Sequence, residues 1–118
     1  MQITIEDKDY NLYFGLDFLE WCEDNAGLKV DGVNMGIGGF NMLYSKLEMF
    51  DPVAIMKILK GATNTLKAKP SNTQLEFFLE GLIVEDKFEE FAEELQETLK
   101  GQPFTSVQIK KMSQNQEA

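Results

Sequence analysis

The chain has 118 residues, a net charge of −9 from 20 acidic residues and 11 lysines, and neither histidine nor arginine; its only cysteine is Cys22. This composition argues against most enzymes, because histidine is the commonest general base and a cysteine without a histidine partner is a poor nucleophile. A negative surface also repels nucleic acid and anionic membranes, so we expect a protein-binding or assembly role with no catalytic residues, cofactor, metal, nucleic acid or membrane.

Residues 1–14 have the pattern of a β-hairpin with one apolar face. Apolar residues recur with the period of two that a strand requires, at Ile3, Ile5, Tyr10, Leu12 and Phe14. The polar run 7–9 separates the two halves of this pattern and predicts the turn. Because an isolated two-stranded hairpin is only marginally stable, we expect it to pack on helices.

A short first helix is predicted over residues 16–26, between Gly15, which ends the strand, and Gly27, which favours helix termination. Cys22 falls on its apolar side, where a free cysteine behaves as a small buried hydrophobe. The next segment, 28–39, is rich in glycine and predicts a loop. Its glycine spacing fits neither the dinucleotide-binding nor the P-loop pattern, so phosphate binding is not expected.

Two longer helices are predicted next. Residues 40–49 carry one apolar stripe at helical spacing. Asp51 and Pro52 then form a start signal, with Asp51 as N-cap and Pro52 as the first helical residue. The helix after them is apolar as far as Leu66 over a wide face. We therefore expect it to be the central helix, contacted on two sides.

Two more helices complete the predicted domain. Thr73 and Glu76 have the spacing of a capping box, ahead of an apolar stripe over 75–82. The last helix, about residues 86–100, has the clearest apolar stripe, and Gly101 ends it. Its other face is acidic: Glu89, Glu90, Glu93, Glu94 and Glu97. We interpret these residues as a solvated face instead of paired catalytic acids or a metal site, because they lie opposite the apolar stripe.

The composition changes after residue 101. Residues 102–118 begin with a weak alternation of apolar residues and end rich in serine, glutamine and asparagine. The alternation is compatible with a strand or with a helix induced on binding, and we expect the last few residues to be disordered. We predict an α+β, mostly α fold: one globular domain at 1–101, with an N-terminal β-hairpin packed on about five helices, and a flexible C-terminal tail at 102–118.

Candidate partner contacts are apolar residues of the glycine-rich segment and of the tail. They are Met35, Ile37 and Phe40 in the first, and Phe104, Val107 and Ile109 in the second. Methionine adapts its shape to varied neighbours, both in cores and at binding surfaces. For Met35, Met42 and Met49, core filling and partner contact therefore both stay open.

The order of these features resembles the tail assembly chaperones of long-tailed phages that infect Gram-positive bacteria. In the hairpin and first helix the matching residues are Ile3, Ile5, Lys8, Tyr10, Leu12, Phe14, Gly15, Phe18 and Leu19. The similarity continues in Asp51 and Pro52, ahead of a helix that ends near 61–63, and in the helices at 75–82 and 88–99. It is a pattern of apolar positions and lengths, and it contains no catalytic signature.

The resemblance implies a role in building a phage tail. Such proteins bind the tape measure protein, keep it soluble while the tail tube polymerises around it, act in the host cytoplasm and are absent from the mature virion. Many also exist in a longer form, made by a ribosomal slip, whose extension recruits the major tail tube protein. Lys110 and Lys111 are the candidate position for such a slip. Many weak contacts along one client also imply self-association.

Cell location is also addressed by the sequence itself. A lone cysteine forms no internal disulfide, which agrees with a reducing cytoplasm. The first residues lack the basic and apolar regions of a signal peptide. Both observations agree with the expected cytoplasmic location.

Two other functions stay open. An acidic DNA-mimic inhibitor of a host nucleic-acid enzyme would suit the net charge, although the acids belong to amphipathic helices and 11 lysines dilute the field. Strong, salt-sensitive binding to a basic nuclease would favour it. A small enzyme would need a carboxylate or lysine mechanism, and turnover by the chain alone would favour that function.

Overall fold

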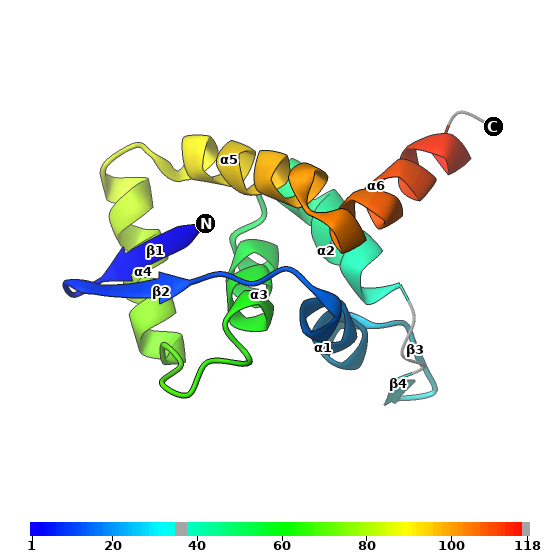
Figure 1. The fold of residues 1–118 in the computed structure, drawn as a ribbon, viewed down its shortest axis with the longest axis horizontal. Coiled ribbons are helices and arrows are strands. Elements are labelled where there is room, and N and C mark those ends of the chain that lie inside the picture. The colour runs from blue at the N-terminus through cyan, green and yellow to red at the C-terminus, as the bar shows by residue number, and fades with distance from the viewer. Residues whose placement is uncertain (35–37, 117–118) are drawn as a thin grey trace.

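The N-terminal hairpin is confirmed. The computed structural model describes residues 1–34 and 38–116, and strands β1 (Gln2–Ile5) and β2 (Lys8–Asn11) pair antiparallel with Ile3 opposite Tyr10. The side chains of Ile3, Ile5 and Tyr10 are buried. The hairpin lies across one helix at one end of the molecule (Figure 1). Packing on this helix gives it the stability that an isolated two-stranded hairpin lacks.

Helix α1 (Leu16–Ala26) has the predicted bounds. The segment after it contains a second small hairpin, β3 (Lys29–Val30) and β4 (Val33–Asn34), where we expected a loop. The turn between them is Asp31–Gly32, and both residues have positive φ values, 51° and 81°. An Asp-Gly turn of this kind matches the twist of two short strands, which explains the difference.

The next two helices are α2 (Gly39–Glu48) and α3 (Pro52–Ala62). The predicted start of α3 is confirmed: the Asp51 carboxylate accepts a hydrogen bond from the Val53 N–H at 2.9 Å, and Pro52 is the first helical residue. Ile55, Ile58 and Leu59 are fully buried, so α3 is the central helix. It ends at Ala62, a turn before the end of the apolar pattern at Leu66 but within the range 61–63 that the family resemblance implies.

Helix α4 (Asn72–Val84) begins at a different capping box from the predicted one. Ser71 Oγ accepts from the Gln74 N–H at 3.1 Å, and Gln74 Oε1 accepts from the Ser71 N–H at 2.9 Å. Thr73 and Glu76 have the same spacing, but they lie inside the helix. Ser71 has the extended backbone of an N-cap, and Pro70 before it keeps the helix from starting earlier.

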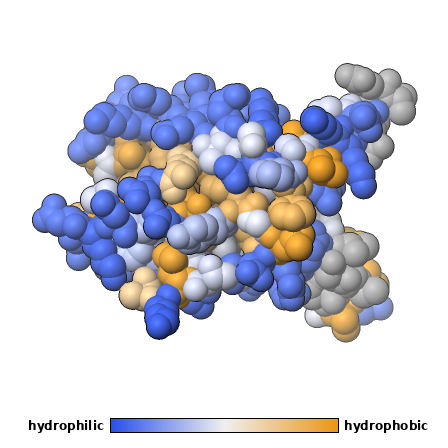
Figure 2. Space-filling model, in the orientation of Figure 1, coloured by the Kyte–Doolittle hydropathy of each residue, from blue (hydrophilic) through white to orange (hydrophobic). Residues whose placement is uncertain are grey.

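Helix α5 (Phe88–Gly101) buries its apolar stripe as predicted and runs along one side of the molecule (Figure 1). Its buried residues are Phe91, Ala92, Leu95 and Leu99. The glutamates of its other face are exposed, and hydrophilic residues cover this side of the surface (Figure 2). The interpretation of this face as solvated agrees with that exposure.

A sixth helix, α6 (Pro103–Gln116), occupies the region where we expected a tail without fixed structure. It packs on α5 through Thr105, which is fully buried, and Ile109, which is 9% exposed. The Thr105 hydroxyl donates to the Leu99 carbonyl at 2.5 Å. Hydrophobic periodicity does not predict this helix, because its apolar residues form no continuous stripe. The mostly α fold with an N-terminal hairpin is confirmed.

Candidate functional site

The sequence-predicted contact residues do not form one surface. Met35 and Ile37 lie outside the described residues. Phe40 is only 1% exposed and Ile109 is buried, so both are core residues in this conformation. Phe104 and Val107 are about half exposed on α6 and are accessible to a partner. Of the predicted set, the structure therefore leaves these two as available contacts.

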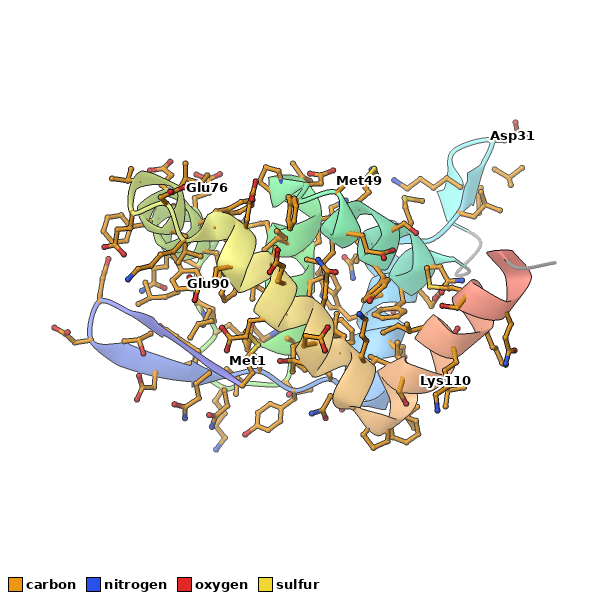
Figure 3. All side chains as sticks on the ribbon, turned by 90° about the horizontal axis from the view of Figure 1, so that it is seen from above. Met1, Asp31, Met49, Glu76, Glu90 and Lys110 are labelled. Atoms are coloured by element: carbon orange, nitrogen blue, oxygen red, sulfur yellow. The ribbon has the colours of Figure 1, made fainter. Side chains whose placement is uncertain are left out.

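Two of the three methionines in question are at the surface. The side chains of Met42 and Met49 are 42% and 71% exposed, so core filling does not explain them. Met35 lies outside the described residues. Figure 3 shows Met49 at the edge of the molecule opposite Met1 and Lys110. Lys110 and Lys111 are exposed on α6, as ordinary surface lysines are.

Cys22 is a free cysteine held in the core, where it is fully buried. Burial, and to a smaller extent the neighbouring Glu23 carboxylate, raise the pKa of its thiol to about 12. At neutral pH the group is therefore a thiol and not the reactive thiolate. Across residues 1–34 and 38–116 no group of three or more metal-ligating side chains comes together.

Helix α4 carries the apolar surface that sequence reasoning missed. It buries Leu75 and Leu79 but exposes Phe77, Ile83 and Val84, with exposed fractions of 61%, 54% and 85%. An isolated exposed hydrophobe is common, whereas several large exposed apolar side chains on one helix are typical of an interaction site. The signal was present in the sequence, since Phe77 falls off the predicted stripe and 82–84 are all apolar.

A shallow groove of about 380 Å³ lies between α3 and α4. We call it the α3–α4 groove; it is lined by Pro52, Val53, Met56, Glu76, Leu79, Glu80 and Ile83. Its floor is apolar, and its charged residues, Glu76 and Glu80, are both acidic. Val53 is 62% exposed there. Figure 3 places Glu76 at the same edge as Met49, away from the face that carries Met1.

The other side of α4 has a second depression, of about 230 Å³, between this helix and the N-terminal hairpin. Phe77 and Gly81 of α4 and Glu85 just after it contribute to this depression, as do Thr4 and Glu6 of the hairpin. Helix α4 is therefore open to contact on both flanks. This arrangement can hold apolar side chains of a partner.

The comparisons with known proteins point to one family. The sequence model of a family described as "Phage tail assembly chaperone protein, TAC" matches residues 2–114. Searches among curated proteins and among solved structures gave no significant match. In the part of the chain that the structure describes, no helix has the length and apolar character to cross a bilayer.

Proposed function

Because the chain belongs to the phage tail assembly chaperone family, we propose that it binds the tape measure protein, keeps it soluble and helps the tail tube polymerise around it. The observation that supports this proposal is the exposed apolar surface of α4 and the α3–α4 groove. Burying apolar surface is the main source of affinity for an apolar client. Large exposed side chains on an otherwise charged domain are typical of interaction sites.

The net charge of −9 suits the same role. A chaperone must remain dissolved while its client is bound, and acidic residues favour solubility. The glutamates of α5 lie on a different helix from the exposed apolar residues of α4. Contact and solubility are thus assigned to separate surfaces.

Several finer points extend the proposal. The chain would act in the host cytoplasm and be absent from the mature virion, and it would self-associate along one client. A longer form, made by a slip at Lys110–Lys111, would recruit the major tail tube protein. Phe104 and Val107, both exposed on α6, are a second candidate contact with client or neighbour. Expression with the native downstream DNA tests the longer form, since a minor larger product with the same N-terminus is expected.

The direct test is co-expression with the tape measure protein of the same phage. We expect the tape measure protein to be insoluble alone, to become soluble with the chaperone, and to co-purify with it through an affinity tag on either partner. A tape measure protein that stays insoluble, or that is soluble without any association, would contradict the proposal. A basic nuclease in place of the tape measure protein is the control, because the DNA-mimic alternative predicts that the nuclease binds.

A further inference from the structure

A second hollow adjoins the α3–α4 groove and carries the opposite charge. It measures about 300 Å³ and is lined by Asn25, Ala26, Gly27, Leu28, Lys29, Met42, Leu43, Lys46, Val53, Ala54 and Lys57. We call it the lysine hollow. Three lysines meet here on a chain that has 11 in all and a net charge of −9. No carboxylate belongs to its described lining, and no lysine to that of the groove.

The two hollows meet at the beginning of α3, and we call them together the strip. Val53 lines both of them, Met56 lines the groove, and Lys57 lines the lysine hollow. Val53, which the two hollows share, is 62% exposed, and Met42 in the lysine hollow is 42% exposed. One border is therefore basic and the other acidic, with an apolar track between them.

Such a strip matches an amphipathic helix better than it matches a uniformly charged partner. Side chains of α2, α3 and α4 form most of its walls, as in complexes where an apolar helix face lies in a groove between helices. A helix presents an apolar stripe with two polar flanks, one on each side. Opposite charges facing each other favour docking, and like charges facing each other oppose it.

We propose that this strip binds one amphipathic helix of the client in a single direction. The acidic flank of that helix faces Lys29, Lys46 and Lys57, and its basic flank faces Glu76 and Glu80. Turning the helix end for end would place both flanks against like charge. The inference rests on the proposed function for the identity of the client, and it adds that copies along one client all take the same orientation.

The first test uses the full chain and synthetic amphipathic helical peptides of equal composition. All have a leucine stripe; in one peptide lysines occupy one flank and glutamates the other, and in a second peptide both charges are mixed on both flanks. At low salt we expect the segregated peptide to bind about tenfold more tightly, by fluorescence anisotropy, and the difference to shrink as salt rises. Equal affinities at low salt would overturn the proposal.

A third peptide, in which the two charged flanks are exchanged, tests the direction in which the helix lies on the strip. A paramagnetic label at the peptide N-terminus should broaden one set of chaperone amide signals for the segregated peptide and a different set for the exchanged one. The exchange reverses the direction in which the flanks match. Broadening of the same amides by both peptides would overturn the single-direction claim.

Charge reversal on the chaperone completes the test. Lys29→Glu with Lys46→Glu, or Glu76→Lys with Glu80→Lys, should each weaken the segregated peptide about tenfold. Combining all four changes should restore its affinity with the peptide direction reversed. These four side chains are exposed, so the variants should fold. The matched control is Lys67→Glu with Lys69→Glu, two exposed lysines outside the strip.

The outcomes separate this inference from the proposed function. Tape measure binding that persists while the peptides show no preference would leave the function standing and overturn the inference. If the peptides behave as expected but the tape measure protein does not bind, the proposed function is overturned and the directional binding of an amphipathic helix stands. If the charge reversals change the sedimentation of the chain alone and not peptide affinity, the occupant is a second copy and the inference fails.

Discussion

Helices α4 and α5 differ in how many of their apolar side chains the folded domain buries. Every apolar residue in the central stripe of α5 is buried, namely Phe91, Ala92, Leu95 and Leu99. Helix α4 buries Leu75 and Leu79, yet it exposes Phe77, Ile83 and Val84. Folding alone explains α5, whereas the exposed residues of α4 gain little from folding. The comparison teaches that an apolar residue which the core does not use is the better guide to function.

The largest expected effect is on the α5 side of this comparison. Leu95→Ala removes a fully buried side chain and should lower the free energy of unfolding by about 3 kcal/mol. Denaturant unfolding followed by circular dichroism measures this loss. Cys22 gives a second readout: because burial raises its pKa to about 12, it should react with thiol reagents only when the core opens, and faster in this variant. An unchanged unfolding midpoint would contradict the claim that burial in the core explains the apolar residues of α5.

On α4 the effect should fall on binding and not on stability. Ile83→Ser should leave the free energy of unfolding within about 0.5 kcal/mol, because the side chain is 54% exposed, and should weaken tape measure binding about tenfold. Pull-down titration measures the affinity. Tyr13→Ser is the matched control, with a side chain that is 52% exposed and outside the α3–α4 groove. Equal weakening by both variants would show that the groove has no special role.

The start of α4 allows a finer test. Ser71→Ala removes one half of the capping box and should cost about 1 kcal/mol of stability, with the position of the exposed apolar residues unchanged. Thermal unfolding measures the cost. Thr73→Ala is the control, because Thr73 lies inside the helix and is not the cap. A larger loss for Thr73→Ala would restore the capping box expected from the sequence.

The smallest effect is expected at the start of α5. Its N-cap, Lys87, makes no side-chain capping hydrogen bond, and its ion pair with Glu85, at 3.7 Å, is exposed. Lys87→Ser would supply a capping hydroxyl and should raise stability by about 0.5 kcal/mol. Differential scanning calorimetry of this variant and of Lys67→Ser, an exposed loop control, would show the gain. A loss of stability would mean that the lysine contributes more than its geometry indicates.

The comparison also shows which parts of the fold local sequence could predict. Asp51 and Pro52 fixed the start of α3 because N-capping depends on neighbouring residues alone. The hairpin and the α5 stripe followed from periodicity. Helix α6 could not be recognised in the same way, since Thr105 and Ile109 are buried through tertiary packing, in which α6 contacts both α5 and α2.

The candidate site was less accessible to sequence reasoning than the fold. Phe40 looked available because it borders a glycine-rich segment, but it packs edge-on against Phe18 with ring centroids 5.9 Å apart. Val53 and Ile83 looked like parts of ordinary helix faces. Only the angle between α3 and α4 leaves both exposed at one groove, and that angle depends on tertiary packing.

Hydrogen–deuterium exchange of the chain, alone and bound to the tape measure protein, tests the central claim most directly. The account predicts slower exchange on binding in α4 (Asn72–Val84) and at the start of α3, because a covering partner suppresses local opening there. The amides of α5 (Phe88–Gly101) should change little. Protection of α5 or α6 with α4 unchanged would contradict the account, because the client would then bind a surface other than the exposed apolar residues of α4.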